Sequence, residues 1–351
     1  MSNTNPINSY ASAGVDIDAA DAAKKRIAEY VRATRRPEVL TELGGFSGMF
    51  AVNPLNLREP VLVSSIDGVG TKLKVAFAMK KFDTVGRDLV CHCVNDILTS
   101  GAKPLFFLDY LALGSMNPDD VAAVVSGVAQ GCQQNGCALI GGETAQMPGF
   151  YVEGEFDLAG TIIGVAEKAS IITGAAIQEG DVVIGLPSAG LHTNGYSLAR
   201  KIYEQEDWTT FRSELGASIG ETLLLPHISY LNPVMNILDN TEYHALVTGM
   251  AHITGGGLLD NIPRVIPAGL GVNLRAETWM IPTVFYDMQR RYSVSWTEMA
   301  RVFNIGVGFV MIVRKDFAET AATIMQAAGA RVIGEVVSRD DGACVQIEGL
   351  G

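Results

Sequence analysis

Short apolar runs alternate with apolar positions at helical spacing along the first half of the chain. Residues 60–63, Pro-Val-Leu-Val, predict a strand that enters a core before Asp67. Residues 86–100 carry Leu, Val, Cys and Ile at intervals of three and four, which predicts a helix with one broad apolar face. Residues 104–113 are apolar on both faces, so they predict a buried strand, with Asp109 in its middle.

The alternation continues further along the chain. Residues 118–135 fit a helix with Pro118 near its start. Residues 138–140 fit a strand that stops at Gly141-Gly142-Glu143-Thr144. Before all of these, residues 18–36 predict a helix that ends at Pro37.

The strand pattern lapses near residues 166–176 and begins again at Asp181. A chain of 351 residues exceeds the size at which one hydrophobic core usually keeps growing. We therefore predict two domains, residues 1–170 and residues 171–351. Strands alternate with helices in both halves, which indicates an α/β or α+β fold.

A phosphate-binding pattern follows the first predicted strand. Asp67 stands at its end, where a charge must be either solvated or used. Gly68 and Gly70 allow backbone N–H groups to turn toward a ligand, and Thr71 and Lys72 add a hydroxyl and a cation. The spacing is not that of the common phosphate loop. An ordinary Asp-Gly turn between strand and helix is an equal alternative at this point.

Two further carboxylates lie beside predicted turns or helix edges. Asp96 falls at the border of the apolar stripe on the helix at 86–100, next to His92, whereas Asn95 lies farther round. Glu143 follows two glycines at the end of a predicted strand, which repeats the arrangement around Asp67. A carboxylate at such a border can be half buried and still reach a ligand.

The second half of the chain offers two glycine-rich loops that lead into predicted helices. Residues 187–197 contain His192 and Asn194, and the helix begins at Ser197. Residues 251–257 run Ala-His-Ile-Thr-Gly-Gly-Gly. Helix N-termini behind glycine loops can bind phosphate without net positive charge nearby.

Composition narrows the class of protein. The chain is 48% hydrophobic and 18% charged, which is typical of a globular protein, and its formal charge of -12 argues against nucleic acid as a partner. No apolar run reaches the roughly 18 residues that a membrane helix needs, and the polar N-terminus does not resemble a signal peptide. We expect a cytoplasmic protein with no membrane partner.

Five cysteines argue against a disulfide framework and for a reducing compartment. Cys91-His92-Cys93 invites a metal interpretation, but the spacing is not that of a zinc site, and buried thiols are the stronger interpretation. We expect His92, His227 and His244 to be structural or surface residues.

Several of these stretches, taken together and in order, resemble the phosphoribosylformylglycinamidine cyclo-ligase family, also called AIR synthetase. The match extends over nearly the whole chain. The stretches that carry it are Ala13-Gly14-Val15-Asp16-Ile17-Asp18, Thr34-Arg-Arg-Pro-Glu, Asp67-Gly-Val-Gly-Thr-Lys-Leu, Cys93-Val-Asn-Asp-Ile-Leu, Gly141-Gly-Glu-Thr-Ala-Gln-Met-Pro-Gly, Gly190-Leu-His-Thr-Asn-Gly-Tyr-Ser-Leu, His252-Ile-Thr-Gly-Gly-Gly and Phe303-Asn304 with Gly306-Val307-Gly308.

The resemblance implies a fold, an assembly and a reaction. The N-terminal domains would pair their mixed sheets into a barrel in a homodimer, with a C-terminal α/β domain outside. The family uses ATP to close the imidazole ring of formylglycinamidine ribonucleotide (FGAM), giving aminoimidazole ribonucleotide (AIR) in purine synthesis. The γ-phosphate is transferred to the formyl oxygen, and a nitrogen on the amidine side then attacks that carbon while phosphate leaves.

The resemblance also suggests roles for the candidate residues. Asp67, Asp96 and Glu143 would hold Mg²⁺, since phosphoryl transfer needs a cation between the phosphates. The glycine segment from Gly44 to Gly48 would suit a lid over ATP. The remaining assignments are ATP for Gly45, Gly68, Gly70, Thr71, Lys72, Asn95 and Thr144; substrate for His192, Asn194, Thr254, Gly255 and Gly256; and catalysis for Asp67, Lys72, Asp96 and His192.

Two positions depart from the family pattern, and other functions compete. Ile66 replaces an expected threonine, which removes a hydroxyl, and Gln146 replaces an expected glutamate. Thiamine-monophosphate kinase and selenophosphate synthetase share the ATP-binding superfamily, but the latter is expected to carry a reactive cysteine near its N-terminus, and no cysteine precedes Cys91. A dimer that binds nucleotide without turnover is the rival of another class.

Overall fold

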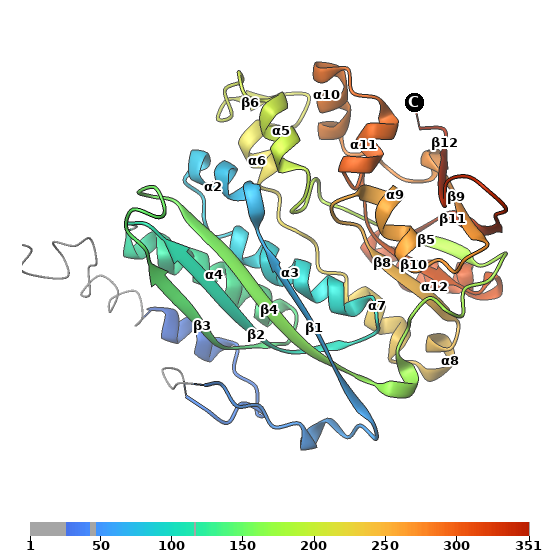
Figure 1. The fold of residues 1–351 in the computed structure, drawn as a ribbon, viewed down its shortest axis with the longest axis horizontal. Coiled ribbons are helices and arrows are strands. Elements are labelled where there is room, and N and C mark those ends of the chain that lie inside the picture. Colours follow the sequence, from blue (N-terminus) through green and yellow to red (C-terminus); the bar gives the residue numbers. More distant parts are fainter. Residues whose placement is uncertain (1–25, 43–46, 116, 351) are drawn as a thin grey trace, which may run out of the picture.

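The computed structural model describes residues 26–42, 47–115 and 117–350 (Figure 1). Residues 26–33 are helical. The predicted helix at 18–36 is thus confirmed over residues 26–33 and ends three residues earlier than expected, while residues 18–25 lie outside the described residues.

A four-stranded mixed sheet forms the first layer of the molecule. Its order is β1-β4-β2-β3, with β2 and β3 parallel and the other pairs antiparallel. Helices α3 and α4 lie behind this sheet in Figure 1. The elements of this part are β1 (Pro60–Gly68), η3 (Gly70–Lys72), α2 (Leu73–Met79), α3 (Val85–Leu98), β2 (Lys103–Leu113), α4 (Pro118–Gln134), β3 (Ala138–Gln146) and β4 (Phe156–Glu167).

Apolar periodicity explains why α3 packs where it does. Leu89, Val90, Val94 and Ile97 recur at helical spacing and are all buried. The predicted helices at 86–100 and 118–135 and the strands at 60–63 and 104–113 are therefore confirmed, with small shifts at their ends.

The strand predicted at 138–140 is longer than expected. It runs through Gly141, Gly142 and Glu143 to Gln146, because β2 pairs with it along this whole length. Gly142 lies opposite Asp109 on β2, and a Cβ atom at this position would overlap the Asp109 carboxylate. Both glycines therefore lie within a strand and not in a turn, and Gly142 makes room for Asp109.

A six-stranded sheet forms the core of the second half, in the order β12-β9-β11-β5-β10-β8. β10 is buried along its full length, which accounts for its unbroken apolar sequence. The elements are β5 (Val182–Pro187), α5 (Tyr196–Ile202), β6 (Phe211–Arg212), β7 (Ala217–Ser218), α6 (Ile219–Leu223), α7 (Leu231–Leu238), α8 (Thr241–His244), β8 (Val247–His252), α9 (Gly257–Asn261), β9 (Leu270–Arg275), α10 (Thr283–Tyr292), α11 (Trp296–Val302), β10 (Val307–Val313), α12 (Ala318–Ile324), β11 (Arg331–Ser338) and β12 (Val345–Glu348).

Helix α3 joins the two halves. Its apolar side packs on the first sheet, and its polar side faces the second half, where Asn95 accepts a hydrogen bond from the Tyr230 backbone N–H and Asp96 contacts His252. Figure 1 shows α3 between the first sheet and the chain around α7. The polar side of one helix therefore forms a wall of the domain junction.

On the face of the first sheet that points away from α3 and α4, several apolar side chains are exposed in the part of the chain that the structure describes. Leu62 and Ile66 on β1 are 64% and 71% exposed, and Tyr110 on β2 is 42% exposed. In the part of the chain that the structure describes, no helix long and apolar enough to cross a membrane occurs.

Candidate active site

Two aspartates and one histidine meet where β1 ends beside α3. His92 Nε2 lies 2.7 Å from Asp67 Oδ2 and 3.8 Å from Asp96 Oδ2. The Ser65 hydroxyl donates to Asp96 Oδ2 at 2.8 Å. The carboxylate side chains of Asp67 and Asp96 keep 41% and 30% of their exposure, so solvent and ligands can reach both.

Both carboxylates are held in their charged form. Burial alone would raise the pKa of Asp67, but the hydrogen bond and charge of His92 outweigh it and set the pKa below its ordinary value. Burial likewise opposes the ionisation of Asp96, yet its hydrogen bond from His252 lowers the pKa. Two ionised, solvent-reachable carboxylates next to each other are suited to a hard cation that retains some of its water.

Four histidines surround these aspartates, and we name them the histidine cluster: His92, His192, His227 and His252. His252 Nδ1 lies 2.8 Å from Asp96 Oδ1. His227 Nε2 lies 3.1 Å from His252 Nε2, and the rings of His192 and His227 stack with centroids 4.0 Å apart. All four side chains are buried.

The pKa is raised for one histidine of the cluster, His92, and lowered for the other three. Burial disfavours the charged form of His92, but Asp67 and Asp96 raise its pKa above the ordinary value. Burial lowers the pKa of His192 and of His227 well below the ordinary value, and nearby positive groups add to the effect. Burial also lowers the pKa of His252, against the pull of Asp96.

Sequence reasoning missed this cluster. The expectation that His92 and His227 are structural or surface residues overlooked their contacts with Asp67 and His252. The spacing of His92 and Asp96 by one helical turn was the available signal for the first contact. Nothing local marks His227, which reaches the site from a loop before α7.

Lys72 is placed differently from the expectation that it neutralises phosphate. Its side chain is completely buried, and its ammonium lies 2.7 Å from Asp88 Oδ2 on α3. It also donates to the carbonyls of His192 and Leu225, each at 3.0 Å. The ammonium therefore joins the two halves of the chain and lines none of the cavities described below.

Asn95 is likewise engaged within the protein. Its amide nitrogen donates to the Ile228 carbonyl at 2.8 Å and lies 3.1 Å from His227 Nε2, and its oxygen accepts from the Tyr230 N–H at 2.9 Å. Asn95 is fully buried, so in this arrangement it holds the segment before α7 and presents no free group to a metal.

The predicted grouping of Glu143 with Asp67 and Asp96 does not occur within one chain. The strand order separates β1 from β3 by two strands, which corresponds to roughly 14 Å at about 4.8 Å per strand. Glu143 pairs with Tyr110 and shares its open side of the sheet, whereas Asp67 faces α3. Thr144 follows Glu143 on the same distant strand and is exposed.

The glycine loops of the second half meet Thr71 at a cavity of about 560 Å³. Asn194, Gly255 and Gly256 line this cavity, and so does Arg301 on α11. The residues predicted to bind substrate, Asn194, Gly255 and Gly256, are thus brought together with Thr71, which was predicted to bind the nucleotide.

The loop after β8 is held by one side chain. Asn261 donates to the carbonyls of Thr254, Gly255 and Gly257, and the Thr254 hydroxyl donates to Asn261 Oδ1. The hydroxyl of Thr254 is therefore used within the loop, while Gly255 and Gly256 face the cavity.

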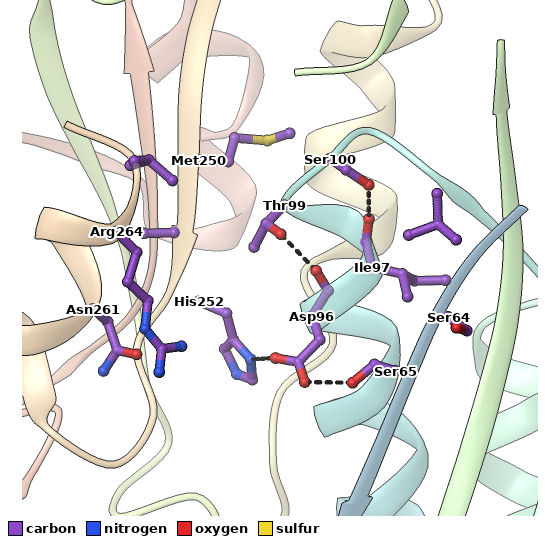
Figure 2. A pocket seen from close by; sticks show the side chains of 13 residues that line it. Ser64, Ser65, Asp96, Ile97, Thr99, Ser100, Met250, His252, Asn261 and Arg264 are labelled. Carbon is purple, nitrogen blue, oxygen red and sulfur yellow. Dashed lines mark hydrogen bonds and ion pairs between the residues drawn. The ribbon is translucent and has the colours of Figure 1, made fainter. Parts of the chain in front are cut away.

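A second cavity of about 350 Å³ is lined by Asp96, Ser65 and His252. Figure 2 shows Asp96 between Ser65 and His252, with Asn261 and Arg264 across the space. Arg264 has no hydrogen-bond or ion-pair partner among the residues that the structure describes. Asp96 thus borders this cavity, whereas neither Asp67 nor Asp96 lines the cavity beside Thr71.

The remaining predicted residues take varied positions. Gly68 donates its N–H to Asp67 Oδ1 at 2.6 Å, and Gly70 has a φ of 65°, which favours glycine. His192 also has a positive φ, 63°, and its Nε2 accepts from the Ala189 N–H. Gly45, like the larger part of the predicted lid, lies outside the described residues.

Comparison with solved structures defines the class of fold. A thiamine-monophosphate kinase from Stenotrophomonas maltophilia superposes with a TM-score of 0.67 at 16% identity, covering 92% of this chain and 96% of its own. The hydrogenase maturation protein HypE in complex with ATP gives a TM-score of 0.65 at 15% identity, covering 94% and 92%. These likenesses confirm the predicted mixed α/β architecture.

Sequence comparison defines the family more closely. Residues 51–166 match the N-terminal domain of AIR synthase related proteins, and residues 178–346 match the C-terminal domain. Phosphoribosylformylglycinamidine cyclo-ligases from Desulfitobacterium hafniense and Sorangium cellulosum are 51% and 52% identical, each over 95% of this chain and over 98% and 96% of their own. The chain therefore belongs to the AIR synthase related family, among the phosphoribosylformylglycinamidine cyclo-ligases.

Proposed function

We propose that this protein uses ATP to close the imidazole ring of FGAM, forming AIR, ADP and phosphate in purine biosynthesis. The observation that carries the proposal is the pair of ionised carboxylates, Asp67 and Asp96, with Asp96 in the wall of a cavity, in a chain about half identical to cyclo-ligases. The separate cavity beside Thr71 gives room for a second ligand of the same reaction.

Mg²⁺ fits the carboxylate pair. Asp67 and Asp96 offer hard oxygen ligands, both with a lowered pKa and both open to solvent. When bound, the ion would neutralise charge on the transferring phosphoryl group. Glu143 lies on the far strand, so we assign the ion to the two aspartates of one chain.

The reaction proceeds in two steps. The bond between the γ-phosphorus of ATP and its bridging oxygen breaks, and the formyl oxygen of FGAM takes the phosphoryl group. The amidine-side nitrogen then attacks the formyl carbon, the carbon–oxygen bond breaks, inorganic phosphate leaves and the nitrogen loses a proton. Because the attack is intramolecular, the main task of the protein is to fold the substrate and exclude water.

The cavity beside Thr71 is the proposed place for the substrate phosphate. Gly255 and Gly256 allow close approach to the backbone, and Asn194 and Arg301 supply donors. We assign His192 and Thr254 to the support of this cavity, because His192 is buried and Thr254 is bonded to Asn261.

Lys72 acts in this proposal as a positioning residue. Its bonds to Asp88 and to the carbonyls of His192 and Leu225 fix the second-half loops against α3. The two halves, residues 1–170 and 171–351, would then act as one ATP-binding and one substrate-completing domain.

A homodimer is part of the proposal. The open apolar side of the first sheet, with Leu62, Ile66 and Tyr110 exposed, is a surface that a second copy can cover. Pairing there would bring Glu143 to the interface, since it shares that side with Tyr110. Sedimentation of the purified chain as a monomer would exclude this assembly.

The compartment proposed is the cytoplasm. All five cysteines are free, and four of them are buried. Thiols persist in this state in a reducing environment.

The decisive experiment measures ADP and AIR in one tube, with Mg²⁺ and ATP, in the presence and absence of FGAM. Equal amounts of both products, each dependent on FGAM, are expected. ADP without AIR would indicate another acceptor, as in the kinase that shares the fold. Binding of ATP without any turnover would leave a nucleotide-binding dimer.

A further inference from the structure

The cavity of about 350 Å³ carries opposite charges on its two sides. Among the described residues that line it, Asp96 is the anion and Arg264 is the cation. Arg264 ends the short 3₁₀ segment η5 (Ile262–Arg264), and Figure 2 shows it across the space from Asp96. His252 also lines the cavity, but burial lowers its pKa, so it is neutral at pH 7.

The two opposite charges do not pair with each other. The oxygens of Asp96 already accept hydrogen bonds from His252 and from Ser65. Arg264 forms neither a hydrogen bond nor an ion pair with any residue in the described part of the chain. A guanidinium stays charged at ordinary pH and carries five N–H donors in one plane. The cavity therefore offers a set of unused donors opposite an ionised carboxylate.

This arrangement suits a phosphoryl group as the ligand. A guanidinium can donate two parallel hydrogen bonds to two phosphoryl oxygens, and a further oxygen can share a divalent cation with a carboxylate. The apolar part of the cavity wall limits access of water, which strengthens both interactions. It consists of Val63, Ile97, Met250, Ala251 and Val265.

The cavity beside Thr71 is a different place from this one. The two cavities have no lining residue in common, so a phosphate held in one does not occupy the other. A single segment nevertheless serves both, because α9 begins directly after Gly256 at the first cavity and η5 continues from α9 to Arg264 at the second. Asn261 holds this segment together by donating to three carbonyls of the glycine loop.

We propose that Arg264 is a catalytic residue that binds the γ-phosphoryl group of ATP during its transfer to the formyl oxygen. This inference rests on the proposed function, since it assigns one more residue to that reaction. While the bond from the γ-phosphorus to the bridging oxygen breaks and the bond to the formyl oxygen forms, negative charge lies on the three remaining phosphoryl oxygens. Arg264 donates hydrogen bonds to two of them and neither gains nor loses a proton.

The first test measures binding without turnover. Calorimetry of the full-length protein with Mg²⁺ compares ADP with the β,γ-methylene analogue of ATP, which carries a γ-phosphoryl group but does not transfer it. In Arg264→Ala we expect the affinity for the analogue to fall by about tenfold, because a hydrogen bond between charged groups is lost, while the affinity for ADP stays the same. Arg290→Ala is the matched control, since Arg290 is exposed on α10 and lines neither cavity.

The second test measures turnover with FGAM. In Arg264→Ala we expect kcat to fall by about a hundredfold or more, because donors to the charged transition state are lost, and the KM for FGAM to stay nearly unchanged. Arg264→Lys keeps the charge without the planar pair of donors, so it should recover only a small part of the loss.

Circular dichroism shows whether each variant is folded, which we expect because Arg264 bonds to no described residue. An affinity for the ATP analogue that is unchanged in folded Arg264→Ala, or an unchanged kcat, would overturn the proposal. A change confined to the KM for FGAM would also overturn it, since Arg264 would then bind the substrate phosphate. If the wild type forms no AIR, the proposed ring closure fails, whereas the comparison of ADP with the analogue still tests the contact of Arg264 with the γ-phosphoryl group.

Discussion

Asp88 and Asp96 stand two turns apart on the same side of α3, and their environments are opposite. Asp88 is completely buried against Lys72, and burial raises its pKa despite that ion pair. Asp96 lies beside a cavity and keeps 30% of its side-chain exposure, and its contacts lower its pKa. One helix therefore carries an internal ion pair at one end of its polar side and a ligand-ready carboxylate at the other.

The contrast shows what helical periodicity can and cannot reveal. The spacing of eight residues places both aspartates on one side of α3. It does not reveal which of them the second half of the chain covers. That depends on the Leu225 and His192 loops, which close over Asp88 and Lys72 and leave Asp96 accessible.

The largest effect on stability is expected from the buried ion pair between Lys72 and Asp88. Lys72→Met leaves the Asp88 charge without its partner, which should cost about 3–5 kcal/mol of unfolding free energy in urea denaturation. The double variant Lys72→Met, Asp88→Asn removes both charges and should recover most of that loss. A single variant as stable as the wild type would show that the ion pair does not hold the loops.

A substitution of the accessible Asp96 should lower the turnover rate and leave stability unchanged. Asp96→Asn is expected to leave the chain folded and to lower FGAM-dependent ADP formation by at least about a hundredfold, because a ligand charge is lost from the metal site. Asp83→Asn is the control, because this carboxylate is exposed and lines neither cavity. Wild-type kinetics in Asp96→Asn would remove this residue from the mechanism.

A smaller effect on stability is expected when the pH is lowered, because of His227. This residue contacts Asp88 through its backbone N–H and His252 through its ring. Its pKa in the folded state is lowered, so below the ordinary histidine pKa of about 6.5 the unfolded chain takes up a proton that the folded chain does not. Stability should therefore fall with pH below that value, by up to about 1.4 kcal/mol per pH unit for this residue. Thermal melts of His227→Gln and wild type should diverge as the pH decreases from 7.5 to 5.5.

The smallest effect should come from Ser65→Ala. The hydroxyl donates one hydrogen bond to Asp96, worth about 1 kcal/mol, so turnover should fall by about fivefold with the melting temperature nearly unchanged. A loss as large as that of Asp96→Asn would mean that Ser65 itself contacts a ligand.

Much of the first half was predictable because its signals are local. The apolar spacing of α3 and α4 and the buried run of β2 fix those elements, and Asp67 and Asp96 follow from their positions at a strand end and a helix border. The end of β3 was predicted too early, at Gly141-Gly142. A pair of glycines can form a turn or can lie within a strand beside a bulky neighbour, and the sequence alone does not distinguish the two cases.

The rest of the site depends on contacts between distant residues. His227 and His252 come from a loop and a strand end, and both lie more than a hundred residues after His92 on its helix. Lys72 follows a ligand-type loop, yet its partner Asp88 is revealed only when α3 packs beside that loop. No pattern within one segment carries this information.

The polar side of α3 has a consequence for the integrity of the chain. Asp88, Asn95 and Asp96 bond to residues more than 130 positions later, so the halves share a buried junction as well as a connecting segment. A protein cut once within residues 171–176 should remain associated as two fragments that co-purify and retain their helical content. In evolution, such a junction would allow a gene to split while its two products still assembled.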